Sequence, residues 1–493
     1  MTITSIPSLS PRYWPMWWRV TILLNISFYN MMGNVFAAGI SPFFGLLIQE
    51  FHCSPEQASR LASYALLALG LSNLLALPTV EYLGKRYTIL TSMVIFLGAN
   101  IWAGKAQSYN SLLGSRFVAG LANGSIEALG PLIVSECFHE HQLARAMVVY
   151  VGFLAAGSAV GPIVAGGIAS GLNNWRWFFY VSAIAIVVNL ISAILMLPET
   201  THTPNDYSPN GLSPTPEREK DGSSHDEDTT ERGITISSSA QENQSLKSLW
   251  LKRSFTTRFL HGKKKENPVK LFLQPFPMFL APPVLITTIV FGLTIGWTVL
   301  TSIVVSNVYV AAPYLWKSWQ IGLINFGPLV GLSIGLPLGG LTADMLSKAA
   351  LKRSHGEHDP RSRLPALVLG GLISPSGCLV IGYTLERDLH WIGAAVGWGM
   401  VAFGLTASAN VLLAYTVDCF RMRAGHVGVL VNVAKNALGF GVSFASMNWY
   451  YSTGPATQFG TMAGLLWAGY LCVIPLYIYS HSLVRFSERI LRL

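Results

Sequence analysis

Long runs of apolar residues recur along this chain, and short polar stretches separate them. Each run holds about 20 or more residues, the length that an α-helix needs to cross a bilayer. Helices are predicted rather than strands, because a spanning helix satisfies its backbone hydrogen bonds internally and a barrel strand needs only about ten residues. The predicted spans lie near 20–48, 57–80, 88–106, 111–136, 143–169, 177–197, 281–312, 319–345, 364–384, 390–417, 424–450 and 460–482. The pattern therefore predicts an all-α membrane protein with twelve transmembrane helices in two six-helix halves.

The hydrophobic pattern breaks once, between the sixth and the seventh span. This stretch is rich in Ser, Thr, Pro and charged residues, so it cannot bury enough apolar surface to fold alone. Near its end, Leu246 to Lys265 mixes apolar residues with bases, which fits either an amphipathic helix on the membrane surface or a solvated basic tether. The predicted division is an N-terminal tail (1–19), a first half (20–199), a disordered linker (200–275), a second half (276–483) and a C-terminal tail (484–493).

Composition and charge agree with lipid as the solvent. Hydrophobic residues make up 51% of the chain and charged residues only 12%, whereas an ordinary globular protein has roughly a quarter charged residues. The net charge of +9 does not require a nucleic-acid partner, because Lys and Arg concentrate in alternate connections, as the positive-inside tendency predicts for cytoplasmic loops. We expect a monomer surrounded by membrane lipid, multi-pass in the plasma membrane, with both termini in the cytoplasm and no nucleic-acid partner.

The sequence offers no pattern of an enzyme or of a metal site. The five cysteines are scattered singly, and no P-loop, zinc-protease or nucleophile-elbow motif occurs. We therefore expect no catalytic residue, no cofactor and no bound metal.

Two loops carry related motifs at corresponding places in the two halves. The first is LPTVEYLGKRYTIL (77–90), with Glu81, Gly84, Lys85 and Arg86, and the second is GLTADMLSK (340–348), with Gly340 and Asp344. Both resemble the loop signature of the major facilitator superfamily. The first departs from it at Leu77 and Glu81, and the second lacks the following Gly and the paired bases.

The fourth and fifth spans resemble those of fungal twelve-span drug:proton antiporters, a branch that includes polyamine and organic-cation carriers. The matching residues are Arg116 and Gly120 in span four, Gly157, Gly161, Pro162, Gly166 and Gly167 in span five, and Asp418, Asn432, Lys435 and Asn436 near spans ten and eleven. The resemblance implies a transporter that exchanges a small molecule for protons, with Arg116 in coupling and the fifth-span motif in gating. Close helix packing through small residues is the alternative reading of that motif.

Charges inside a span call for an explanation, because each costs at least about 2.5 kcal/mol to insert. Glu127 and Lys435 are two such deep charges. Helical spacing places Arg116, Gly120, Asn123 and Glu127 on one face, Asn432, Lys435 and Asn436 on a second, and Ser27, Asn30 and Asn34 on a third. Desolvation disfavours a charged carboxylate, so Glu127 could exchange a proton for a cation, although a permanent pair with Lys435 is also open.

Several other residues are candidates for the substrate site or for helix joining. Asn410 carries an amide that could bind substrate or connect helices, and Trp297 offers an aromatic face to a cation. Arg116 could equally serve as a structural anchor.

These observations predict a secondary transporter that alternates access around a central cavity. The favoured function is export of a small organic molecule by proton antiport, with an organic cation as one candidate substrate. Proton-coupled uptake of a cationic nutrient or polyamine is the alternative, and a transporter-like receptor is a more remote one.

Overall fold

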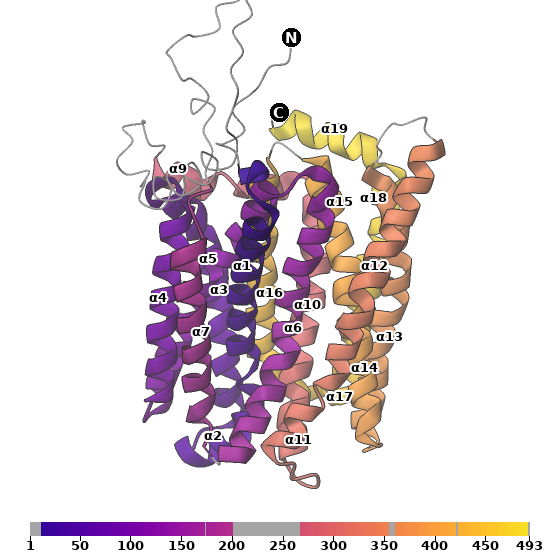
Figure 1. The fold of residues 1–493 in the computed structure, drawn as a ribbon. Helices are drawn as coiled ribbons and strands as arrows, with labels where there is room; N and C mark the ends of the chain where they lie inside the picture. The colour runs from indigo at the N-terminus through magenta and orange to yellow at the C-terminus, as the bar shows by residue number, and fades with distance from the viewer. Residues whose placement is uncertain (1–10, 173, 201–266, 354–359, 421–422, 492–493) are drawn as a thin grey trace, which may run out of the picture.

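The computed structural model describes residues 11–172, 174–200, 267–353, 360–420 and 423–491. Within these residues twelve helical segments are long and apolar enough to cross a membrane, which confirms the predicted fold class. Every predicted span overlaps one of them (Figure 1). The Leu246 to Lys265 segment, for which an interfacial helix was one expectation, lies outside the described residues.

The first half contains six spans. Span one is interrupted, because a turn at Gly39 and Ile40 and a 3-10 helix, Ser41–Phe43, separate its main helix from a short continuation. The helices are α1 (Met16–Ala38), its continuation α2 (Phe44–Phe51), α3 (Pro55–Leu83), α4 (Lys85–Gly104), α5 (Tyr109–Cys137), α6 (Glu140–Leu172) and α7 (Arg176–Met196). Since α1 begins at Met16, the helix takes in the last residues of the predicted 1–19 tail.

The second half repeats this plan with more interruptions. Its helices are α10 (Pro282–Val310), α11 (Ser318–Leu323), α12 (Phe326–Arg353), α13 (Leu367–Glu386), α14 (Trp391–Gly404), α15 (Asn410–Cys419), α16 (Ala424–Thr453), α17 (Pro455–Leu471), α18 (Val473–Ile478) and α19 (Ser480–Leu491). A short helix, α9 (Pro268–Leu273), lies within the predicted disordered linker and packs on α3 of the first half, so that part of the linker is ordered. A π-helical turn, Leu405–Ala409, joins α14 to α15 within span ten. The predicted C-terminal tail is largely helical, because α19 includes most of its residues. This helix lies across the end of the bundle (Figure 1).

Polar and apolar side chains are distributed as lipid requires. Large apolar residues such as Ile184 and Val188 on α7 are exposed on the outside, whereas Asn73, Arg116 and Glu127 are buried inside the bundle. This distribution follows from the solvent, because hydrocarbon gives no hydrogen bonds to a polar group that faces it. The polar interior is therefore where a transport site has to lie.

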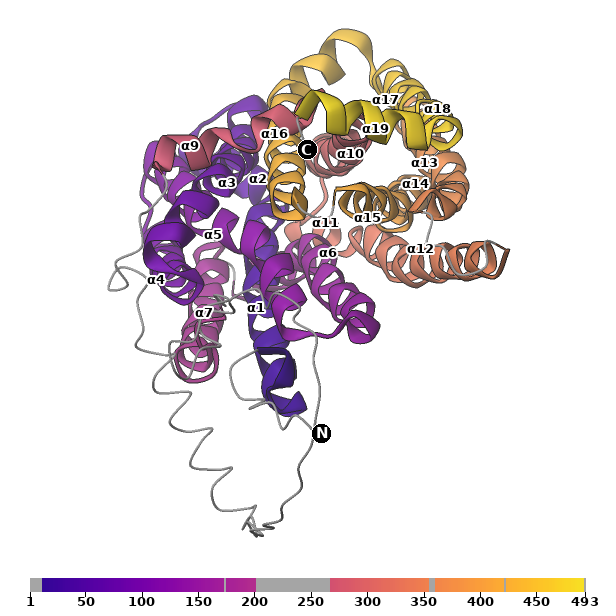
Figure 2. The same ribbon diagram turned by 90° about the horizontal axis from the view of Figure 1, so that it is seen from above.

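The two halves lie side by side when the bundle is seen along the spans (Figure 2). One seam between them joins α3 to α16, with Ser443 Oγ 2.8 Å from Ser63 Oγ and the rings of Tyr64 and Phe440 5.8 Å apart. The other seam joins α6 to α11 and α12. We call the end of the bundle where α1 begins and α19 lies the terminal face, and the end with α2 and α11 the opposite face (Figure 1).

Candidate functional site

A buried ion pair connects the two halves inside the bundle. Glu127 of α5 pairs with Lys435 of α16 through Oε1, and its Oε2 accepts hydrogen bonds from Asn73 Nδ2 of α3 and Asn436 Nδ2 of α16, both at 2.9 Å. Asn432 Nδ2 donates to the backbone oxygen of Glu127 at 3.3 Å. Both carboxylate oxygens are therefore paired, and three of the four side chains that bind Glu127 belong to the opposite half.

Close packing of α5 on α3 brings these groups together. A Cβ atom on Gly120 would lie 2.5 Å from the backbone oxygen of Ala65, and one on Gly124 would lie 2.5 Å from that of Leu69. Only glycine permits such backbone contact at both positions. Asn73, one turn beyond Leu69, thereby comes within hydrogen-bond distance of Glu127.

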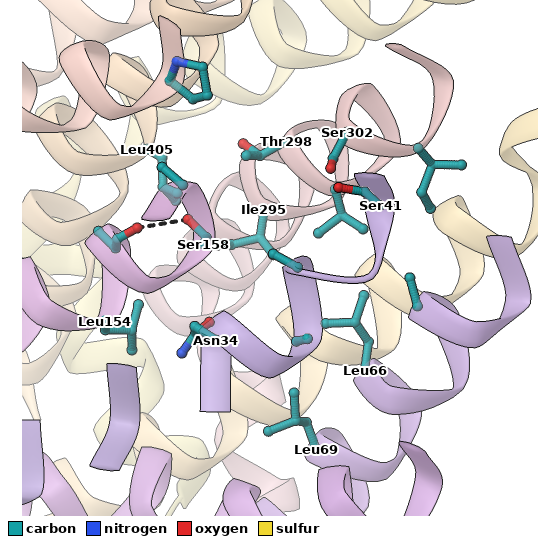
Figure 3. A pocket seen from close by; sticks show the side chains of 18 of the residues that line it. Asn34, Ser41, Leu66, Leu69, Leu154, Ser158, Ile295, Thr298, Ser302 and Leu405 are labelled. Atoms are coloured by element: carbon teal, nitrogen blue, oxygen red, sulfur yellow. Dashed lines mark hydrogen bonds between the residues drawn. The ribbon is translucent and has the colours of Figure 1, made fainter. Parts of the chain in front are cut away.

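A cavity of about 110 Å³ lies between the halves, with the ion pair in its wall. Figure 3 shows Asn34, Ser41, Leu66, Ser158 and Thr298 around it, drawn from both halves. The remaining wall is mostly apolar, and includes Leu154, Ile295, Leu332, Trp398 and Leu405. A mostly apolar cavity with a few polar groups at a domain interface is the usual form of a small-molecule site.

The predicted substrate residues divide into two groups. Asn34, Glu127, Lys435 and Asn436 line the cavity, and Asn432 supports Glu127 from the same face of α16. The others lie outside the lining. Asn30 is fully buried, and Asn123 packs on Gly33 of α1. Asn410, at the start of α15, donates to the oxygen of Thr406 in the preceding π-helical turn, and the ring of Trp297 packs near that of Trp449.

Five lining residues with hydrogen-bonding side chains were absent from the sequence prediction. They are Ser41, Ser158, Thr298, Ser302 and Trp398. Thr298 and Ser302 lie one turn apart on α10, and this spacing was the available signal for their shared face. Ser41, Ser158 and Trp398 carry no charge and sit in apolar sequence, so nothing in the chain marked them.

Arg116 anchors helices and contacts no carboxylate within the described residues. Its Nη1 and Nη2 donate to the backbone oxygens of Phe36 and Ala37 at 2.7 and 2.8 Å, and Nε donates to that of Leu61 at 2.8 Å. Phe36 and Ala37 belong to the last turn of α1, whose carbonyls lack helical partners and attract cations. These contacts account for the buried arginine by anchoring, while its predicted part in coupling stays a prediction.

The first loop motif connects the start of α4 to the ends of spans four and six on the terminal face. Gly84 has φ of +83°, so the chain turns sharply and exposes the first amides of α4. The Glu199 carboxylate accepts hydrogen bonds from the amides of Lys85 and Arg86 at 3.3 and 3.0 Å, as a helix N-terminus favours. Lys85 pairs with Glu136 at the end of α5. Glu81, by contrast, is only half-buried beside the turn.

The second half has an ion pair at the corresponding place. Asp418, at the end of span ten, pairs with Arg363 before α13 at 2.9 Å. This pair occupies the place in the second half that Lys85 and Glu136 occupy in the first. Asp344 of the motif is exposed, and a Cβ on Gly340 would meet nothing within 4 Å.

The fifth-span glycines pack α6 against both halves. A Cβ on Gly157 would lie 2.5 Å from the oxygen of Met31, and one on Gly161 would lie 2.8 Å from that of Val35, both on α1. Gly166 meets the backbone of α11, where its Cβ would be 2.6 Å from the oxygen of Ser318. Pro162 lies inside the continuous helix, and its oxygen faces Gly322. The packing interpretation thus has direct support, and gating stays a prediction.

These features define a class: a twelve-helix membrane transporter with a small-molecule cavity between two related halves. The family model of the Major Facilitator Superfamily matches residues 23–446. The chain belongs to this superfamily.

Curated relatives place the chain with fungal transporters. The MFS transporter cpaT of Aspergillus oryzae is 26% identical, over 96% of this chain and 88% of its own length. The probable drug/proton antiporter YHK8 of Saccharomyces cerevisiae is 24% identical, over 86% and 74%. The efflux pump radE of Floropilus chiversii is 23% identical, over 90% and 77%. The resemblance drawn from the fourth and fifth spans is thereby confirmed.

Among solved structures, the xylose transporter XylE from E. coli, in a partially occluded inward open conformation, matches with a TM-score of 0.62. The match covers 94% of this chain and 99% of that one at 12% identity, so it shows the shared fold alone.

Arg116→Lys should destabilise the protein by roughly 2–4 kcal/mol, because lysine cannot direct three donors at three carbonyls and each charged hydrogen bond contributes about 1.5–3 kcal/mol. Denaturant unfolding in detergent micelles measures this loss. Arg60→Lys is the control, since its pair with Glu56 is partly exposed and such pairs contribute at most about 1 kcal/mol. Equal losses in both variants would contradict an anchoring role for Arg116.

Gly161→Ala should cost about 1–3 kcal/mol, because its new methyl group would overlap the backbone of α1. Gly167→Ala, in the same motif, should be close to neutral, because a Cβ there meets nothing within 4 Å. Thermal unfolding of both variants measures the contrast. If the two lose equal stability, the α1 contact does not account for Gly161.

Proposed function

We propose that this protein exports a small organic molecule in exchange for protons, with Glu127 as the coupling carboxylate. The observation that carries the proposal is that Glu127 borders the cavity in one half while Lys435 and Asn436 bind it from the other. The names of two relatives, a probable drug/proton antiporter and an efflux pump, support exchange and export.

Protonation of Glu127 would act on the contact between the halves. A neutral carboxyl leaves the Lys435 ammonium buried without its counter-charge, and breaking a buried pair in this way costs about 3–5 kcal/mol. The arrangement that holds the pair would then lose stability relative to one in which α16 has moved away from α5. A proton can shift access to the cavity only through such a difference between the two states.

We also propose that the terminal face is cytoplasmic. Lys85, Arg86, Arg363, Arg423 and Arg485 all lie at that end of the bundle, next to the starts or ends of spans. Basic residues within about 15–20 residues of span ends orient a membrane protein with that side inward. The plasma membrane is the location we expect, as in the sequence interpretation.

Glu127→Gln should abolish exchange of substrate for protons, because glutamine keeps the shape of the side chain but does not take up or release a proton. In proteoliposomes with an imposed pH gradient and an enclosed pH dye, we expect substrate-dependent proton flux to fall at least about tenfold. The substrate is chosen beforehand by growth protection against a panel of amines, acids and hydrophobic drugs.

Glu56→Gln is the matched control for this experiment. Glu56 Oε1 accepts a hydrogen bond from Asn448 at 3.2 Å across the same seam, yet Glu56 lies outside the cavity lining. Its variant should retain full proton flux. Flux that survives in Glu127→Gln would remove Glu127 from coupling, and proton movement in the same direction as the substrate would establish symport instead.

A further inference from the structure

The charged side chains of the cavity wall form an ion pair with each other. Glu127 and Lys435 are the ionisable residues among those that line the described cavity. They form an ion pair, and two amides complete the shell of the carboxylate. Lys435 Nζ also lies 5.5 Å from the centre of the Phe291 ring. The wall therefore presents no net charge to an occupant.

Most of the neutral donors on the wall are committed too. Ser158 Oγ donates to the oxygen of Ala155 at 2.7 Å, a bond visible in Figure 3, and Thr298 Oγ1 donates to that of Thr294 at 2.9 Å. Asn34 Nδ2 donates to the oxygen of Asn30 at 3.0 Å. All three groups still offer oxygen lone pairs to a ligand. The hydroxyl hydrogens of Ser158 and Thr298 are used within their own helices, as is one of the two amide hydrogens of Asn34.

Trp398 differs from these residues. It lines the cavity from α14 and is 2% exposed, yet its indole Nε1 has no hydrogen-bond partner in the described part of the chain. An indole N–H can only donate, and a buried donor without a partner costs about 1–3 kcal/mol. Ser41 Oγ, on the wall near the opposite face, is likewise buried and without a partner among the described residues. Among the described residues of this mostly apolar wall, Trp398 and Ser41 thus carry the buried donor atoms that have no partner.

We infer, on the basis of the proposed transport function, that the substrate is an uncharged and largely apolar molecule with an acceptor oxygen, and that Trp398 Nε1 donates to this oxygen. The apolar wall from α3, α6 and α10 takes the body of the molecule. Ser41 provides a second polar contact. Trp398 is then a specificity-determining residue, because a site that hydrogen-bonds a substrate group rejects analogues that lack it.

A permanent cation fits this wall poorly. It would have to displace Lys435 from Glu127, or share a carboxylate that already accepts from three side-chain donors. Either route leaves a buried positive charge without compensation. The aromatic residue proposed for cation binding, Trp297, is outside the lining. The contacts therefore favour the uncharged class over the organic cations considered from the sequence.

Indole nitrogen NMR tests this inference directly. The full-length protein, with ¹⁵N-labelled tryptophan in nanodiscs, contains 14 indole groups, and the Trp398 signal is identified by its loss in Trp398→Phe. The probe is N,N-dimethylbenzamide, which is uncharged and has one strong acceptor oxygen. We expect the Trp398 signal to shift downfield with saturation, and the affinity for the probe to fall about five- to tenfold in Trp398→Phe.

Two controls test whether the shift is specific to the cavity and to an acceptor oxygen. Trp297 is also 2% exposed with an unpartnered indole nitrogen among the described residues, but it lies outside the lining, so its signal should stay in place. Benzyltrimethylammonium, of similar size but cationic and without an acceptor, should move neither signal. A stationary Trp398 signal, or one that responds to the cation and not to the amide, overturns the inference.

The result is separable from that of the proposed function. If proton exchange requires Glu127 but the Trp398 signal does not move, the inferred substrate class is wrong and the proposed antiport stands. A saturable shift of Trp398 without any proton exchange overturns antiport and leaves the binding site in place.

Discussion

The structure depends on one constraint, that a carboxylate and an ammonium inside a bilayer must neutralise each other within the protein. Glu127 and Lys435 meet this constraint across the two halves, with Asn73 and Asn436 as further donors. Lipid supplies no hydrogen bonds, so each half is incomplete without the other at this point. The glycine contacts of α5 with α3 follow from the same need, because they bring Asn73 close enough to take part.

Contacts within a half and contacts between halves differ in kind, and the difference suits a rocking motion. Within the first half, Arg116 joins α5 to the end of α1 and to α3 through backbone oxygens, and Glu199 joins the loop before α4 to the end of span six. Between the halves, most of the polar links among the described residues join two side chains, such as Ser63 with Ser443 and Glu127 with Lys435, and Asn432 donates to the backbone oxygen of Glu127. Side-chain contacts can exchange partners without unwinding a helix, so the halves can move as units.

The sequence was sufficient for the fold and for part of the site. Span length and apolarity predicted all twelve helices, and the cost of burying charge singled out Glu127 and Lys435. It could not choose which polar faces meet, because helix rotation is set by packing across the bundle. Among the three polar faces that helical spacing defines, those of α5 and α16 meet at Glu127, and the further hydrogen bond comes from α3, through Asn73. Trp398 was missed for the same reason: a tryptophan in an apolar run is ordinary until neighbouring helices leave its N–H without a partner.

The neutrality of the cavity bears on how coupling can work. If the substrate were a cation, it could compete with a proton for the same carboxylate, and exchange would follow from simple displacement. An uncharged substrate held by Trp398 does not need the oxygens of Glu127, so proton and substrate can influence each other only by favouring different arrangements of the same halves. The ion pair between α5 and α16 is suited to this role, because it borders the cavity, belongs to both halves and would break on protonation of Glu127. In the proposed exchange, coupling is therefore a property of the interface rather than of a shared binding atom.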